Sequence, residues 1–175
     1  MNFGRVLSET LKALRDSDVP AIVVGGVAIA AHGVVRGTQD LDLAISSADA
    51  DAAVAALESL GFETIRRTAG FSNHSRPGTA ERVDLLFVSG ATAEALFARA
   101  RPQDLFDSES VPIVDPEHLV AMKLFALQQN PTRQGIDLED VRALLLKGLV
   151  DRPTVLHYLD RYELTEYRRA LGFDA

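Results

Sequence analysis

The chain of 175 residues contains no cysteine. Disulfide bridges and thiolate metal sites are therefore excluded, and a reducing compartment, the cytoplasm, is the simplest expectation. No run of apolar residues approaches the roughly 18 that a membrane-spanning helix requires. We therefore expect a soluble cytoplasmic protein without a membrane partner.

An excess of basic residues is also missing. Lysine and arginine together number 18 and aspartate and glutamate 25, which gives a net charge of −7. Phosphate contacts need clustered basic side chains, so this balance argues against broad, non-specific binding to nucleic acid and leaves only a local basic patch open. Hydrophobic residues make up 47% of the chain, enough for the core of one globular domain with a helical extension.

Several catalytic signatures are absent as well. The four histidines have neither H-x-x-x-H nor H-E-x-x-H spacing, so a zinc site is not expected. The G-x-S-x-G nucleophile motif, the G-x-x-x-x-G-K-[ST] phosphate loop and the G-x-G-x-x-G dinucleotide motif do not occur. The acidic side chains remain as the main candidates for catalytic chemistry.

Hydrophobic periodicity predicts alternating helices and strands that give way to helices alone. We predict an α+β fold with an α/β-like layout: a small mixed β-sheet flanked by helices in residues 1–114, with a helical C-terminal part, residues 115–175, packed on that core. Residues 68–79 are rich in turn formers and are expected to be a loop. Expected strands occupy residues 21–26, 40–45, 62–67, 81–88 and 111–114, and expected helices residues 3–14, 27–33, 47–61, 115–128, 137–148, 152–162 and 165–172.

Two aspartates interrupt the expected strand DLDLAI, residues 40–45. Because side chains alternate along a strand, Asp40 and Asp42 point to one face while Leu41 and Leu43 point to the other. The strand thus has one charged face and one core face, with the two acidic Cα atoms about 6–7 Å apart.

A third acid, Asp84, lies within a second apolar strand, RVDLLFV, which we expect beside the first. Carboxylates brought together repel by about 4 kcal/mol per pair at 4 Å and an effective dielectric constant near 20, so such a cluster needs a cation. Mg²⁺ prefers oxygen ligands from carboxylates and phosphates, and Mn²⁺ is able to replace it. The alternative is that these acids end their strands in solvent or pair with Arg36 or Arg82.

A pair of glycines, Gly25 and Gly26, lies where an apolar strand meets a short helix in VVGGVAIAAHG. Glycine leaves the backbone N–H groups accessible, so this turn suits a phosphate group without the lysine of a phosphate loop. The alternative interpretation is a tight turn between strand and helix with no ligand.

The stretch GGVAIAAHGVVRGTQDLDL, followed by Asp84 on a later strand, resembles the nucleotidyltransferase superfamily. More closely, G-G-x-A followed by R-x-T-x-D-L-D-L resembles the AbiEii-type group of small bacterial nucleotidyltransferase proteins, which includes toxins of toxin–antitoxin pairs. The resemblance covers roughly residues 22–88. It extends more weakly to DPEHLVAMKLFAL, which is similar to the lysine-bearing helix of that group.

The resemblance implies a role for each motif residue. Asp40 and Asp42 would bind Mg²⁺, or Mn²⁺ in its place, and Asp84 would complete the metal site and receive the proton of the acceptor. Two ions about 3.5–4 Å apart would activate the acceptor hydroxyl and stabilise the departing pyrophosphate. The implied nucleotide-binding residues are Gly25 and Gly26 at the triphosphate, Arg36 and Thr38 supporting the loop or the phosphates, and Lys123.

Lys123 has Leu119, Val120, Ala126 and Leu127 as its helical neighbours, so its ammonium must leave an apolar face. It either extends to the rim of that face or, as the family implies, reaches the nucleotide phosphates. Further along, Arg133, Asp137 and Asp140 match an Arg…Lys-Asp…Asp segment of the family, but Ile136 replaces the lysine. The alternative is that these aspartates start a helix.

The main hypothesis is a Mg²⁺-dependent nucleotidyltransferase of EC 2.7.7 type that moves a nucleoside monophosphate from an NTP such as ATP to an acceptor hydroxyl on tRNA or another RNA, a protein or a small molecule. By the resemblance it would be the toxin of a toxin–antitoxin pair, with an antitoxin protein as partner. One alternative is a non-catalytic binding or partner module that keeps the fold. Another is a small-molecule enzyme similar to the aminoglycoside and lincosamide nucleotidyltransferases.

Overall fold

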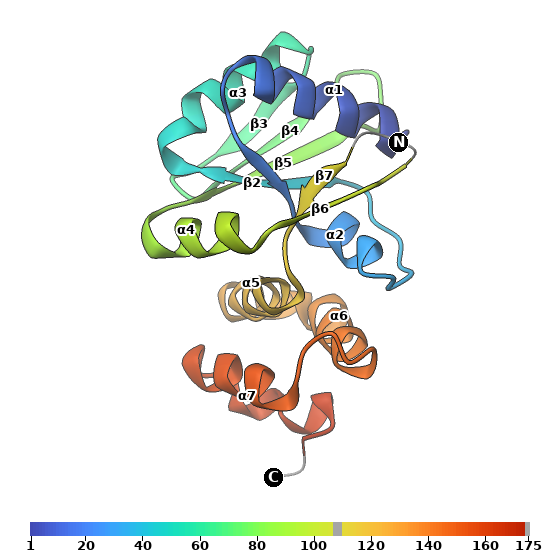
Figure 1. Ribbon diagram of the computed structural model, residues 1–175, viewed down its shortest axis with the longest axis vertical. Helices are drawn as coiled ribbons and strands as arrows, with labels where there is room; N and C mark the ends of the chain where they lie inside the picture. Colours follow the sequence, from blue (N-terminus) through green and yellow to red (C-terminus); the bar gives the residue numbers. More distant parts are fainter. Residues whose placement is uncertain (107–109, 174–175) are drawn as a thin grey trace. The chain divides into compact units, whose positions relative to one another are not determined.

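The computed structural model describes residues 1–106 and 110–173 (Figure 1). The chain divides into two compact units. The N-terminal unit comprises Met1–Ala31 and Val35–Val114, and the C-terminal unit comprises His32–Val34 and Asp115–Ala175.

One mixed sheet of seven strands, counted over the described residues, forms the centre of the N-terminal unit, in the order β3-β4-β5-β2-β1-β7-β6. The central strand β2 pairs with β5 in parallel and with β1 in antiparallel orientation. The sheet and its helices confirm the predicted mixed fold class. The strands are β1 (Ala21–Val23), β2 (Leu41–Ser46), β3 (Glu63–Arg67), β4 (Phe71–Ser75), β5 (Arg82–Val88), β6 (Arg101–Gln103) and β7 (Val111–Ile113).

Helices cover the sheet of the N-terminal unit. Figure 1 shows α1 and α3 next to each other over the sheet, and both contact β2. The core side of α1 carries apolar residues at helical spacing, among them Leu7 and Leu14, which are fully buried. The helices of this unit are α1 (Phe3–Asp16), α2 (Gly25–Ala31), α3 (Ala50–Ser59) and α4 (Gly90–Arg99), with a 3-10 turn at Ser47–Asp49.

The C-terminal unit is helical. Its first helix, α5, packs against both α6 and α7 and begins as the sequence predicts, with Asp115 accepting a hydrogen bond from the His118 backbone N–H at 2.9 Å and Pro116 in the first turn. None of the described helices combines the length and the apolar character that crossing a bilayer requires. The helices are α5 (Pro116–Gln129), α6 (Gln134–Leu146) and α7 (Arg152–Arg161), with 3-10 turns at Pro131–Arg133, Thr165–Tyr167 and Arg169–Leu171.

The prediction of a loop at residues 68–79 was wrong, because this segment contains the strand β4. The segment FSNHS alternates like a strand, but its buried positions, Ser72 and His74, are polar. Ser72 Oγ lies 2.8 Å from His74 Nε2, and Thr64 Oγ1 lies 3.3 Å from His74 Nδ1. These hydrogen bonds compensate the burial of polar groups that a hydrophobicity pattern places outside the core.

Other elements also differ from the prediction. The first strand ends at Val23, and Gly25 already belongs to α2. The strand β6 has no hydrophobic alternation in its sequence, RPQ, and forms by pairing with β7. The expected last helix at residues 165–172 is two 3-10 turns, which end where Gly172 adopts the left-handed conformation.

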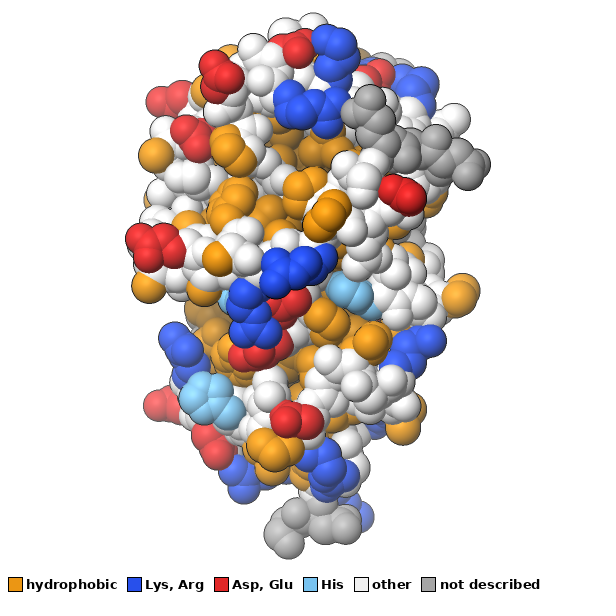
Figure 2. Space-filling view, viewed as in Figure 1, with side chains coloured by type: hydrophobic (Ala, Val, Ile, Leu, Met, Phe, Trp, Pro, Cys, Tyr) orange, Lys and Arg blue, Asp and Glu red, His pale blue; other side chains and the backbone are white. Residues whose placement is uncertain are grey.

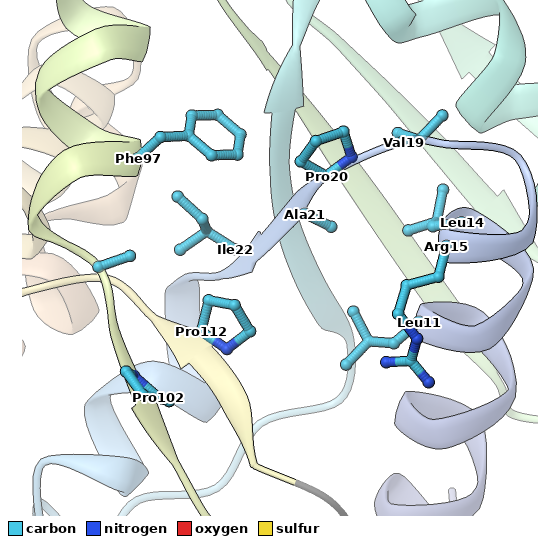
Figure 3. Close-up of a pocket in the computed structure, with 11 residues that line it drawn as sticks. Leu11, Leu14, Arg15, Val19, Pro20, Ala21, Ile22, Phe97, Pro102 and Pro112 are labelled. Carbon is cyan, nitrogen blue, oxygen red and sulfur yellow. The ribbon is translucent and has the colours of Figure 1, made fainter.

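An apolar cavity of about 420 Å³ lies in the N-terminal unit between α1, β1 and α4. Figure 3 shows Leu11, Leu14, Ile22 and Phe97 around it, with Arg15 as its one charged lining residue. Hydrophobic side chains also gather on this part of the surface in Figure 2. The cavity contains none of the acidic candidates and is separate from the site described next.

Candidate active site

Asp40, Asp42 and Asp84 come together in the N-terminal unit. Asp42 on β2 and Asp84 on β5 are direct partners across the parallel strand pair. The strand begins at Leu41, so Asp40 lies one residue before it rather than within it as expected, yet on the same side as Asp42. One carboxylate oxygen from each of the three residues lies within 4.8 Å of the others. The predicted adjacency of the two acidic strands is therefore confirmed.

The local sequence explains why these acids reach the surface of the sheet. Leu41 and Leu43 alternate with them and are fully buried, so the hydrophobic side of β2 holds the strand in the core. All three aspartates are only half-buried. Their carboxylates therefore keep access to solvent and to a ligand.

Burial raises the pKa of the Asp84 carboxyl above its ordinary value of 3.8, and the charge of Asp40 raises it further. A hydrogen bond from the Asn73 side chain and the charge of Arg82 lower the pKa of the same group. The dominant effects thus disfavour a negative charge on Asp84 unless a positive charge joins the cluster. A divalent cation meets that requirement.

The donor set fits a hard divalent cation such as Mg²⁺ or Mn²⁺. The cluster offers carboxylate oxygens from three residues, the ligand type that these ions prefer, and no thiolate ligand is available because the chain lacks cysteine. The fit rests on ligand type and proximity.

The glycine pair lies against the acidic cluster. Gly25 begins α2 with a φ of 61°, and a methyl group built on it would lie 1.9 Å from Oδ2 of Asp42. The neighbouring Gly26 is buried and lies against Arg36 and Thr38 in the same way. The structure thus brings the glycine turn, both R-x-T residues and the acids into one place.

Lys123 is located in the C-terminal unit, on α5. Its ammonium is buried, at 3.1 Å from Oδ1 of Asp137 and 2.8 Å from Oδ2 of Asp140, both on α6. Arg133 also pairs with Asp137, at 2.7 Å from Nε to Oδ2. The Lys123 side chain therefore does not extend to a solvent rim. Asp137 and Asp140 pair with its buried ammonium, in addition to their place on helix α6.

Asn73 is a site residue that sequence reasoning missed. It lies on β4 as the direct partner of Asp84 on β5, and its side chain hydrogen-bonds the Asp84 carboxylate. The only signal in the sequence is an amide in a turn-rich segment that was expected to be a loop. Antiparallel pairing of β4 with β5 is what gives Asn73 this position.

The fold and the acidic site define a member of the nucleotidyltransferase superfamily. The sequence profile of the aminoglycoside-2''-adenylyltransferase family matches residues 6–111, which include the whole acidic cluster and the glycine turn. The chain belongs to this family, a family of nucleotidyltransferase enzymes. The superfamily prediction is thus confirmed, whereas the AbiEii-type assignment is not. No curated protein matches the chain.

Solved structures agree with the fold. ANT(2'')-Ia in complex with adenylyl-2''-tobramycin has 17% sequence identity and a TM-score of 0.70, with 93% of this chain and 99% of that one covered. The lincosamide antibiotic adenylyltransferase LnuA, bound to lincomycin, has 12% identity and a TM-score of 0.55 over 79% and 96% of the two chains. An antigenic nucleotidyltransferase-like protein from Paracoccidioides brasiliensis has 16% identity and a TM-score of 0.55 over 96% and 92%.

Proposed function

We propose that this protein transfers AMP from ATP to a hydroxyl group of a small-molecule acceptor. The observation that carries the proposal is the convergence of three carboxylates beside a glycine turn, in the segment that the adenylyltransferase family profile matches. The proposal selects the small-molecule alternative, because the family and the antibiotic-modifying structures above support it better than a toxin acting on RNA or protein.

In the proposed reaction, Asp40, Asp42 and Asp84 hold the divalent cation. When bound, the cation neutralises charge on the triphosphate and makes the acceptor hydroxyl more acidic. The acceptor oxygen forms a bond to the α-phosphorus of ATP, and the bond from that phosphorus to the pyrophosphate oxygen breaks. We assign to Asp84 the role of receiving the hydroxyl proton, because its carboxylate lies within the cluster at which the hydroxyl would be activated.

We assign the glycine turn and Arg36 to the nucleotide, whereas the predicted contact of Thr38 with the phosphates remains a prediction. The turn at Gly25 and Gly26 has no side chain of its own to hinder a phosphate at its backbone N–H groups, and the Arg36 guanidinium beside Gly26 offers a positive charge. The predicted contact of Lys123 with the phosphates remains a prediction. Within its own unit, that ammonium is already bound by Asp137 and Asp140.

The acceptor we propose is a cationic small molecule that carries several hydroxyl groups, such as an aminoglycoside. The family name and the tobramycin product in a related fold support this class. The net charge of −7 favours a cationic acceptor over an anionic one such as RNA. We propose no antitoxin partner, because nothing in the family match supports one.

The test is incubation of the purified protein with ATP labelled at the α-phosphate, Mg²⁺, and separate panels of aminoglycosides, lincosamides, RNA and proteins. Labelled product is expected with a small-molecule acceptor and only with Mg²⁺ or Mn²⁺ present. The double variant Asp40→Asn plus Asp42→Asn should lose the activity, whereas the exposed-site control Asp18→Asn should keep it.

Label transferred to RNA or protein, with none on small molecules, would favour the other acceptor classes over this proposal. Absence of transfer by the wild-type protein, together with ATP binding that is equal in the wild-type protein and the double variant, would favour the non-catalytic module. Absence of both transfer and metal-dependent ATP binding would overturn the enzyme as described.

A further inference from the structure

Of the residues packed on the glycine turn, Asp42 belongs to the acidic cluster and Thr38 contacts one of its carboxylates. At Gly25, the direction of a Cβ is filled by Asp42, whose Oδ2 and Cγ would lie 1.9 and 2.5 Å from a methyl group there. At Gly26 the same direction is filled by Thr38, whose Oγ1 would lie 2.5 Å away, and by Arg36, whose Nη2 would lie 2.7 Å away. All four distances are far below van der Waals contact, so a side chain at Gly25 or Gly26 would displace these groups.

Thr38 in turn contacts a metal-site carboxylate. Its Oγ1 lies 3.1 Å from Oδ1 of Asp40 and 3.3 Å from the Asp40 backbone oxygen. The hydroxyl has one proton, and the charged carboxylate is the stronger acceptor of the two. Because Asp40 lies before β2 begins, the ladder does not orient its side chain, and Thr38 supplies an orientation that the strand does not.

We propose that Thr38 is a positioning residue for the metal site: packed on Gly26, its hydroxyl holds the Asp40 carboxylate toward Asp42 and Asp84. The proposal rests on the proposed function, in that the three carboxylates hold a divalent cation. Gly26 then has a role that does not require nucleotide, because the absence of a side chain at this position leaves the space that Thr38 occupies. Hydrogen-bonding partners of metal ligands typically contribute 10- to 100-fold to metal affinity.

The experiment measures Mn²⁺ binding to the full-length protein without nucleotide, by the electron paramagnetic resonance signal of free Mn²⁺. Thr38→Val keeps the shape of the side chain and removes the hydroxyl, so we expect Mn²⁺ affinity to fall about 10- to 100-fold. Thr38→Ser keeps the hydroxyl and should stay within about threefold of the wild-type protein. Thr92→Val, at an exposed position on α4, is the matched control and should leave the affinity unchanged.

Gly26→Ala is the second variant, and it should weaken Mn²⁺ binding in the absence of nucleotide by displacing Thr38. Transfer activity gives a further readout: for Thr38→Val, the metal concentration for half-maximal activity should rise, while the KM for ATP at saturating metal stays close to that of the wild-type protein. A role of Thr38 on the phosphates would instead raise the KM for ATP.

Wild-type Mn²⁺ affinity in a folded Thr38→Val protein, judged by its thermal melt, would overturn the positioning role and leave the proposed function intact. Failure of the wild-type protein itself to bind Mn²⁺ would overturn both. If Thr38→Val does not fold, Gly26→Ala and Thr38→Ser decide the question: weak binding by the first with normal binding by the second supports the proposal, and normal binding by both contradicts it.

Discussion

At the scale of single residues, glycine at position 25 satisfies two separate constraints. Its φ of 61° is a left-handed conformation that costs other residues about 1–2 kcal/mol. In addition, Asp42 occupies the direction in which a Cβ would point. Backbone strain and displacement of a metal ligand are thus both expected when this glycine is replaced.

A matched pair of variants separates these two effects. Gly61 also has a positive φ, 82°, but a methyl group built on it meets nothing within 4 Å. We expect Gly61→Ala to lower the free energy of unfolding by about 1–2 kcal/mol, and Gly25→Ala to lower it by more because Asp42 must also move. Only Gly25→Ala should lose transfer activity and Mn²⁺ binding. Equal activity of the two variants would show that Asp42 tolerates the methyl group.

His74 is a second residue whose environment makes a measurable prediction. It is buried on β4, and this burial lowers its pKa from the ordinary value of 6.5, with the charge of Arg67 acting in the same direction and that of Glu58 opposing it. Below pH 6.5 the unfolded chain binds a proton at this site that the folded chain does not. Its contribution to stability is therefore complete above that pH and is lost as the pH falls toward the folded pKa.

We expect urea unfolding between about pH 5 and 8 to show lower stability at the acidic end, with a smaller pH dependence in His74→Gln. His157→Gln, at an exposed histidine of the C-terminal unit, is the control and should keep the wild-type dependence. An unchanged pH profile in His74→Gln would show that other groups cause the acid sensitivity.

At the scale of elements, the pairing of α5 with α6 depends on a buried ionic cluster. Lys123 from α5 binds Asp137 and Asp140 from α6, and Asp137 also binds Arg133. The two positive and two negative charges balance. Burying such a group is tolerated when each charge has a partner, whereas removal of one partner leaves a charge without compensation.

Lys123→Met is expected to destabilise the protein by about 3–5 kcal/mol, measured by urea unfolding. Adding Asp140→Asn should recover part of this loss, because the second change removes the carboxylate that Lys123 compensated. The KM for ATP decides the role of Lys123: at temperatures where the variant is folded, an unchanged KM indicates a structural lysine. A raised KM would support the predicted phosphate contact.

At the scale of the whole molecule, the acidic site lowers the stability of the folded protein when no cation is bound. Three carboxylates within 4.8 Å of one another repel in the absence of a cation. A cation that binds only the folded protein adds about 2.7 kcal/mol of stability at 100 times its dissociation constant. Metal should therefore act as a strong stabiliser of the fold.

We expect Mg²⁺ or Mn²⁺ to raise the melting temperature of the wild-type protein. The double variant Asp40→Asn plus Asp42→Asn should melt higher than the wild-type protein without metal, because two repelling charges are gone, and should not respond to metal. Scanning calorimetry with and without EDTA provides the measurement, with Asp18→Asn as the neutral control. A lower melting temperature for the metal-free double variant would contradict the repulsion argument.

The sequence by itself determined the parts of the protein that depend on local pattern. Alternation of Asp40, Leu41 and Asp42 is a property of any strand, so it indicated which side chains face away from the core. The glycine pair ahead of these acids indicated a turn with exposed backbone, and the helical spacing in α1 indicated its buried face. The superfamily was identified by the resemblance of the motif that contains these glycines and aspartates, together with Asp84 on a later strand.

Only the tertiary structure decided what depends on partners distant in the chain. The parallel pairing of β2 with β5 sets Asp42 beside Asp84, and the pairing of β4 with β5 adds Asn73 from a segment without a hydrophobic pattern. Thr38 packs on Gly26, 12 residues earlier in the chain, through side-chain shape that periodicity does not encode. The physical reason is the same in each case: alternation reports which face is apolar, whereas the choice of partner depends on hydrogen bonds and packing formed only in the folded chain.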